Sequence, residues 1–264
     1  MRPSALLLLL CTAFGLAAQP FDAKRPPNTY RNADNPDYWK NRPPYAGYWQ
    51  QDVHYVIKGR LDDERDQLDA DLTLYYNNNS PDTLRWVFFH LYQQAYEPGS
   101  YADLLDNEGR PSSPRVDRVG TVVHSIADDT TPLRSEQDNT VVKVWLNAPL
   151  PPGERATFRI RFTTHWAMDV QRRMKLFNAW GSKHYDGVHW YPRIAVYDRR
   201  MGWDTQQHLG NELYGDFGTF DVDLDLPHHY VLDATGWLQN IDDVLPADLR
   251  RKLDISNFKD KPWN

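Results

Sequence analysis

The sequence predicts an all-β protein made of several antiparallel sheets and one short helix. Apolar and polar residues alternate with a period of two in five separate segments, as half-buried strands require. Clusters of Asn, Asp, Pro and Gly lie between these segments and are typical of turns. Helical periodicity is scarce, because only 246–253 begins with a proline and places Leu249 and Leu253 on one face.

The predicted strands can be placed in order along the chain. The first two, 53–57 and 68–76, flank an acidic run at 62–66 that we expect at a hairpin tip facing solvent. A denser apolar run at 84–91 is a candidate central strand. The later strands are expected at 142–146, 156–162 and 220–226, with turns at 77–82 and 151–154.

The N-terminus has the pattern of a secretory signal peptide, expected over 1–18. A short basic start precedes an apolar run from Ala5 to Leu16, and small residues follow it. We therefore expect a secreted or periplasmic protein. A lipoprotein anchor on Cys11 is disfavoured because Leu10 stands where a small residue is wanted. No later apolar run is long enough to predict a transmembrane segment.

Two further regions are expected after the signal peptide. Residues 19–46 are rich in Pro, Asn and aromatic side chains, which predicts an extended lead-in because proline removes donors and blocks helix. Residues 47–264 carry the alternating pattern and form the predicted β domain.

The composition excludes several kinds of function. The net charge is −6 without basic runs, so nucleic acid is not an expected partner. The single cysteine excludes a disulfide framework and multi-cysteine metal sites. The sequence contains no His-Glu-x-x-His, the pattern that places two zinc ligands and a general base on one helix. Asp221, Asp223 and Asp225 lack the glycine of a calcium loop and are interpreted as the solvent face of a strand.

The segment 177–214 concentrates aromatic and ionisable residues among several glycines. Such side chains on loops often line a binding surface, but they can equally pack a loop onto a sheet. Composition alone leaves both interpretations open.

An ordered series of motifs begins in this segment. It runs from His189-Trp190-Tyr191-Pro192-Arg193-Ile194-Ala195-Val196-Tyr197-Asp198 through Gly202-Trp203, Leu209-Gly210 and Glu212–Val222 to Ala234–Asn240. The series resembles the N-terminal β domain of secreted bacterial aminopeptidase-N-like zinc metallopeptidases, and the resemblance extends over about 45–253.

The resemblance implies a saddle-like, multi-sheet β domain that covers one side of the active-site cleft beside a thermolysin-like catalytic domain. The family's Gly-Ala-Met-Glu-Asn-like strand and His-Glu-x-x-His are absent here. We therefore expect a fragment: a non-catalytic domain that is inactive alone and binds no metal itself, from a parent enzyme that uses zinc and meets its peptide substrate through the missing catalytic domain.

The resemblance also implies four candidate substrate-binding residues, which are Asp186, His189, Trp190 and Tyr191. In the family a Gln or Glu just before the segment matched by Trp190 and Tyr191 helps to hold the free α-amine of the substrate. This chain has His189 there, which can accept a hydrogen bond when neutral and repels an ammonium group when protonated. Asp186 is the alternative anion, and no catalytic residue is expected.

Two other functions stay open from the sequence. The chain could be a stand-alone secreted β module that binds peptide or carbohydrate through its aromatic loop. It could also be a β scaffold whose exposed apolar face serves for docking to a second domain.

Overall fold

The computed structural model describes residues 45–110, 120–129, 131–166, 174–210 and 214–257. The chain divides into two compact units, 1–49 and 50–264. The predicted signal peptide, Cys11 and most of the predicted lead-in lie outside the described residues. In the first unit, the Tyr48 amide donates a hydrogen bond to the Tyr45 carbonyl at 3.0 Å. The strands and helices of the described residues belong to the second unit.

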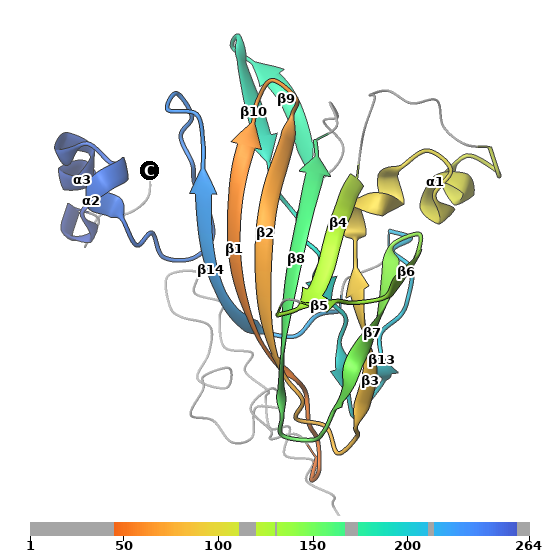
Figure 1. The fold of residues 1–264 in the computed structure, drawn as a ribbon. Helices are drawn as coiled ribbons and strands as arrows, with labels where there is room; N and C mark the ends of the chain where they lie inside the picture. Colours follow the sequence, from red (N-terminus) through yellow and green to blue (C-terminus); the bar gives the residue numbers. More distant parts are fainter. Residues whose placement is uncertain (1–44, 111–119, 130, 167–173, 211–213, 258–264) are drawn as a thin grey trace, which may run out of the picture. The chain divides into compact units, whose positions relative to one another are not determined.

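The largest sheet has six strands in the order β14–β1–β2–β8–β4–β5 (Figure 1). All neighbours are antiparallel except β1 and β14, which run parallel. The strands are β1 (Asp52–Asp62), β2 (Gln67–Asn77), β4 (Gly120–Asp128), β5 (Thr131–Pro132), β8 (Arg155–His165) and β14 (Gly218–Asp225).

A second sheet has four strands in the order β11–β3–β7–β6, and two hairpins add a pair of strands each. The prediction of an all-β, multi-sheet protein is confirmed, and every predicted strand is present. The remaining strands are β3 (Leu84–His90), β6 (Ser135–Asp138), β7 (Val141–Leu150), β9 (Lys175–Ala179), β10 (Ser182–Asp186), β11 (Arg193–Ile194), β12 (Tyr197–Asp198) and β13 (Gly202–Trp203).

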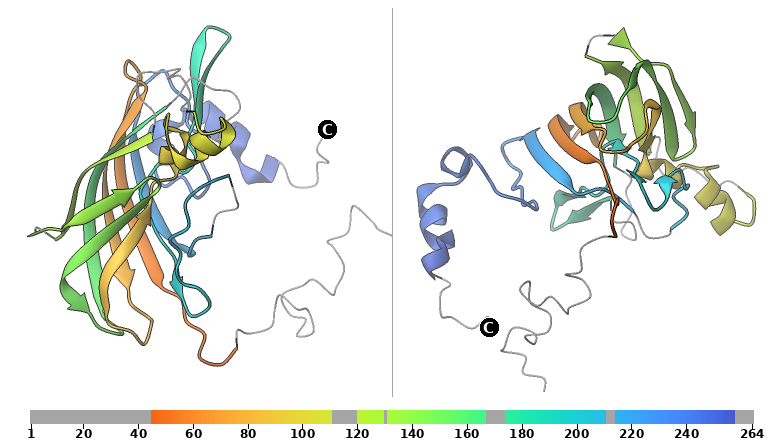
Figure 2. Two further views of the ribbon diagram at one scale, coloured as in Figure 1. Left: turned by 90° about the vertical axis from the view of Figure 1, so that its right-hand side faces the viewer. Right: turned by 90° about the horizontal axis from the view of Figure 1, so that it is seen from below.

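The main core lies between the two larger sheets (Figure 2). The apolar residues of β1, β2, β3, β7 and β8 point inward, so that Leu72 and Leu74 of β2 are at most 1% exposed. Phe89 of β3 and Phe158 of β8 meet edge to face, with ring centroids 5.7 Å apart. Burial of these apolar faces is the main force that holds the two layers together.

Strand β14 departs from the expected half-buried pattern. Its apolar residues Phe220 and Val222 remain 41% and 47% exposed. The physical reason is its position, because β14 is an edge strand with β1 as its one neighbour among the described strands.

Three short α-helices lie among the described residues, where the sequence predicted one. The predicted helix is present as α3 (Ala247–Leu253), and α2 (Ile241–Val244) precedes it. The third, α1 (Tyr101–Asp106), begins where the Ser100 hydroxyl accepts a hydrogen bond from the Asp103 amide at 3.1 Å. None of the helices in the described ranges has the length and apolar character needed to cross a bilayer.

The predicted turn after β2 is built around a buried asparagine. Asn78 is fully buried, and its side-chain nitrogen donates to the carbonyls of Asp82 and Leu150 at 2.8 and 3.0 Å. Its side-chain oxygen accepts from the Ser80 hydroxyl at 2.6 Å. One side chain therefore satisfies a backbone carbonyl within the turn and another at the end of β7.

Candidate functional site

The four residues predicted to bind substrate lie in one stretch between β10 and β11. Asp186 ends β10, and its carboxylate lies 3.3 Å from Lys175 Nζ and 3.6 Å from His184 Nε2. The Asp186 side chain remains 38% exposed. It is thus a carboxylate that solvent can reach, with the Lys175 ammonium and the His184 ring already beside it.

Trp190 and Tyr191 point the other way and pack against the core. The Trp190 ring lies 6.4 Å from that of Phe162, and its carbonyl accepts a hydrogen bond from the Thr164 hydroxyl at 2.7 Å. Tyr191 meets the Tyr55 ring edge to face at 5.4 Å, and burial raises the pKa of Tyr191. These two aromatic residues anchor the stretch to the sheets.

His189 sits at a strained turn between these two parts. Its φ is +54°, in the left-handed region that residues other than glycine rarely adopt. The buried Gln93 amide holds the turn by donating to the Val188 carbonyl at 2.8 Å. The His189 ring then lies 5.1 Å from the ring of Tyr92.

Tyr92 is the centre of a cluster of imidazoles that sequence reasoning missed. Its ring stacks on His90 at 5.1 Å and meets His208 at 5.5 Å. His90 Nε2 lies 3.9 Å from Asp204 Oδ2, which is too long for a hydrogen bond. Burial lowers the pKa of His90 despite the opposing effect of Asp204, so this imidazole is neutral near pH 7. The sequence carried one signal for this cluster, which is His90 at the end of the apolar strand 84–90.

Motif residues after the loop form a network of polar contacts, called the lock below, which contains Arg193, Asp198, Tyr214 and Asp216. Arg193 donates from Nη2 to the Asp216 carbonyl at 3.0 Å. The guanidinium lies directly over Gly215, where an added Cβ would be 2.0 Å from Nη2. Only glycine leaves room for Arg193 there.

Asp198 provides the second half of this lock and is only 1% exposed. Its Oδ1 accepts from the amides of Arg200 and Met201 at 2.9 and 2.8 Å. Its Oδ2 accepts from the Tyr214 hydroxyl. Because Asp198 and Tyr214 are 16 residues apart, this contact ties the β12–β13 hairpin to the segment that leads into β14.

The carboxyl group of Asp216 is buried beside the lock, and its Oδ2 has no hydrogen-bond partner among the described residues. Burial raises the pKa of Asp216 to about 7; Arg193 opposes the shift and Asp198 adds to it. Asp216 is therefore the buried carboxyl group of this site whose charge changes near neutral pH.

The described residues do not fit a zinc ion. No group of three or more His, Cys, Asp or Glu side chains in these ranges is arranged to hold a metal. His228 and His229 lie in a turn, with ring planes at 87°.

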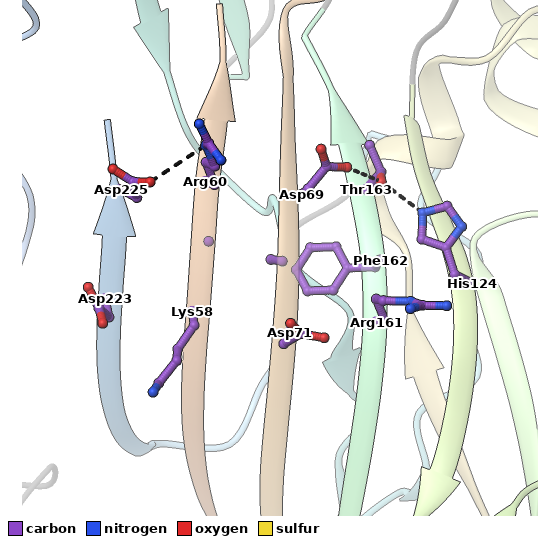
Figure 3. A pocket seen from close by; sticks show the side chains of 12 residues that line it. Lys58, Arg60, Asp69, Asp71, His124, Arg161, Phe162, Thr163, Asp223 and Asp225 are labelled. Atoms are coloured by element: carbon purple, nitrogen blue, oxygen red, sulfur yellow. Dashed lines mark hydrogen bonds and ion pairs between the residues drawn. The ribbon is translucent and has the colours of Figure 1, made fainter. Parts of the chain in front are cut away.

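A groove of about 630 Å³ lies on the polar face of the six-stranded sheet (Figure 3). Oppositely charged side chains line it in rows that cross the strands. Asp71 of β2 faces Arg161 of β8, and Arg60 lies 3.6 Å from Asp225. Because the charges are matched across strands, we interpret the groove as a solvated sheet face. The placement of Asp221, Asp223 and Asp225 on the exposed face of a strand is confirmed.

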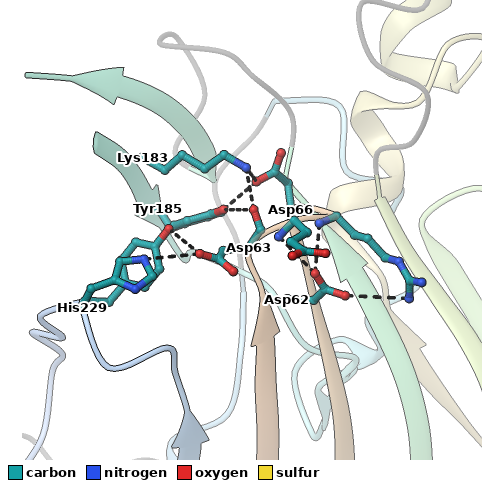
Figure 4. A network of polar contacts seen from close by, with 9 residues as sticks. Asp62, Asp63, Asp66, Lys183, Tyr185 and His229 are labelled. Atoms are coloured by element: carbon teal, nitrogen blue, oxygen red, sulfur yellow. Dashed lines mark hydrogen bonds and ion pairs between the residues drawn. The ribbon is translucent and has the colours of Figure 1, made fainter. Parts of the chain in front are cut away.

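The acidic hairpin tip between β1 and β2 differs from its prediction (Figure 4). We expected 62–66 to face solvent, but the side chains of Asp63 and Asp66 are only 27% and 28% exposed. Lys183 Nζ donates to Asp66 at 2.7 Å, and the Tyr230 hydroxyl donates to Asp63 at 3.2 Å. The β9–β10 hairpin and the turn at 228–230 lie against Asp63 and Asp66 and partly cover them, whereas Glu64 and Arg65 are exposed as predicted.

This contact leads to a prediction about Asp66, whose backbone is also left-handed at φ +54°. Asp66→Asn keeps a residue that tolerates this conformation but removes the charge that Lys183 pairs with. We expect a loss of about 1–2 kcal/mol in the local stability of the β9–β10 hairpin. Faster amide hydrogen exchange confined to 175–186 would show it. The exposed Glu64→Gln is the matched control, and equal exchange in both variants would contradict the prediction.

Comparisons with known proteins give structural relatives only. No family model and no curated protein matches the chain. The structure is similar to a mutant of the M1 zinc metallopeptidase from Deinococcus radiodurans bound to a Tyr-Ser-Ala substrate, with 18% identity over 72% of this chain and 36% of that chain and a TM-score of 0.45. It is also similar to the M1 zinc metallopeptidase from Deinococcus radiodurans in a second structure, with 18% identity over 71% and 35% of the two chains and a TM-score of 0.44. This chain spans about a third of the length of these relatives.

Proposed function

We propose that the chain is the N-terminal, non-catalytic domain of a secreted or periplasmic zinc-dependent aminopeptidase, and that 186–191 forms one wall of the substrate cleft. One observation carries the proposal. The motif residues that resemble the family, among them Arg193, Asp198 and Asp216, build the lock next to this stretch. In the proposal, hydrolysis and its zinc belong to a separate catalytic domain.

The chemistry of the stretch suits a positively charged peptide terminus. Asp186 offers an accessible carboxylate, which would pair with the free α-ammonium of a peptide in a charge-assisted hydrogen bond. Lys175, 3.3 Å away, competes for the same carboxylate and would have to turn aside. A neutral His189 imidazole would accept a second hydrogen bond. Peptide is thus the proposed partner, and nucleic acid is not.

The experiment compares a tripeptide with a free amine and the same peptide N-acetylated. In nuclear magnetic resonance titrations of the whole purified chain, we expect shifts at 186–191 with the free amine and none with the acetylated form. Asp186→Asn should weaken the response at least fivefold. Asp129→Asn removes a carboxylate that is 78% exposed elsewhere and should leave it unchanged. Equal responses to both peptides would contradict the role of 186–191.

A second measurement tests the non-catalytic part of the proposal. We expect no hydrolysis of aminoacyl-anilides by the chain, with or without added zinc. Turnover that a chelator abolishes would overturn this.

One observation favours the alternative of a carbohydrate-binding module. Trp180, at the tip of the β9–β10 hairpin, is fully exposed. Trp190 and Trp203, in the same aromatic-rich segment 177–214, instead pack against the core. The same titrations with a panel of oligosaccharides test this alternative. If an oligosaccharide shifts the resonances of Trp180 while the free-amine peptide shifts no resonance, this second function replaces the first.

A further inference from the structure

We propose that the open edge of β14 binds an extended segment of a partner polypeptide in which basic and apolar residues alternate. The segment would add a strand to the six-stranded sheet beside Gly218–Asp225. This inference does not depend on the proposed peptidase function, because it concerns the sheet edge and not 186–191.

The edge itself is available for strand addition. Among the described residues, β14 pairs with β1 and with no second strand, and all its residues except Leu224 are exposed. An open edge presents unpaired N–H and C=O groups, and an extended peptide can bind by satisfying them. Eight residues offer enough length for such pairing.

The charges on the outer face specify the partner. Along one row, Asp223 faces Lys58, Lys58 faces Asp71, and Asp71 faces Arg161, so the sign alternates from strand to strand (Figure 3). At the open edge of the sheet, the row ends with the carboxylate of Asp223. Cross-strand pairs of opposite charge stabilise a sheet and like pairs destabilise it. A strand added beside β14 therefore needs cations opposite its carboxylates.

The carboxylates of β14 can accept hydrogen bonds from such cations. Asp221 already pairs with His54 at 2.8 Å and Asp225 with Arg60 at 3.6 Å, yet their side chains are still 67% and 72% exposed. A carboxylate has about four lone-pair sites, so each can accept a second donor.

The inner face of β14 specifies the other half of the pattern. Phe220 and Val222 are 41% and 47% exposed there. Apolar residues of the added strand, alternating with its basic ones, would cover these side chains.

The sheet already contains one pairing of this kind. On the outer face, Asp71 of β2 faces Arg161 of β8, and the adjacent residue of β8, Ile160, points to the core. The proposed partner would repeat on β14 what β8 does on β2. Two copies of this chain would instead set one row of Asp residues against another, so self-pairing through β14 is disfavoured.

The test uses the whole chain and a labelled peptide, acetyl-Thr-Arg-Val-Arg-Val-Arg-Thr-amide, in fluorescence anisotropy at low salt. We expect binding that weakens with added salt, since the attraction involves exposed charges. The matching peptide with Glu in place of Arg should bind at least tenfold more weakly. Methylation of alternate peptide nitrogens should also weaken binding at least tenfold, because it removes hydrogen bonds without changing charge.

The variant D221N/D223N/D225N should lose at least tenfold in affinity. The matched control D233N/D243N/D248N changes the net charge equally at exposed positions outside the sheet and should bind as the natural chain does. Equal binding of the methylated peptide, or equal losses in the two triple variants, would show non-specific attraction and overturn the proposal. Dimerisation of the natural chain through β14 would also overturn it.

Discussion

Replacing Tyr55 by alanine is expected to lower the free energy of unfolding by about 3–5 kcal/mol, as for other large buried aromatic residues. Tyr55 is 1% exposed, and its ring stacks on Phe220 at 4.6 Å and meets Tyr191 at 5.4 Å. Its hydroxyl accepts a hydrogen bond from the Ile194 amide at 3.1 Å. One side chain thus joins β1, β14 and the loop that carries the candidate site. Urea denaturation followed by circular dichroism measures the loss.

Tyr55→Phe separates the packing from the hydrogen bond. It keeps the ring contacts but leaves the buried Ile194 amide without its acceptor, which costs about 1–3 kcal/mol. We expect the natural chain, Tyr55→Phe and Tyr55→Ala to unfold in that order of decreasing stability. An alanine variant within 1 kcal/mol of the natural chain would show that this side chain does not join the three elements.

The second large effect is a dependence of stability on pH at Asp216. Its folded pKa of about 7 lies above the usual value of 3.8, because the carboxyl group is buried. Between these values the folded state keeps a proton that the unfolded state has released. Stability therefore falls as pH rises through this window, by about 1 kcal/mol per unit, and the penalty is constant above it.

Asp216→Asn should remove this contribution, since its amide does not titrate. The difference in unfolding free energy between the variant and the natural chain should be small at pH 4 and grow in favour of the variant up to pH 7.5. Denaturant titrations at several pH values measure it. Asp129→Asn, on an exposed side chain, should follow the natural chain at every pH. A difference that does not change with pH would contradict the assignment to Asp216.

The strands could be predicted because alternation is a local property. Leu72, Leu74 and Tyr76 indicate an inward face without knowledge of what covers it. The pairing of the strands was not accessible in the same way. Nothing in the sequence of 218–225 indicates that this strand lies parallel to β1 at the sheet edge. Its first residue, Gly218, pairs with Val53, which is 165 residues earlier in the chain. Exposure of Phe220 and Val222 follows from that position and not from their own sequence.

The candidate site shows the same division. Asp186, His189, Trp190 and Tyr191 are neighbours in the chain, so a sequence motif could name them together. The cluster around Tyr92 joins residues more than 90 positions apart, which no local pattern reports. The acidic tip was misjudged for this reason, because Lys183 approaches Asp66 from 117 residues away.

The buried turn at Asn78 has a consequence for where this protein can be made. Asn78-Asn79-Ser80 is a sequence that N-linked glycosylation enzymes recognise. The nitrogen that would carry the sugar is fully buried and already donates hydrogen bonds to two carbonyls. A glycan can therefore be attached only before the turn closes, and it would then leave no space for the turn to form. A host whose secretory pathway glycosylates nascent chains is for this reason a poor choice for producing the folded protein.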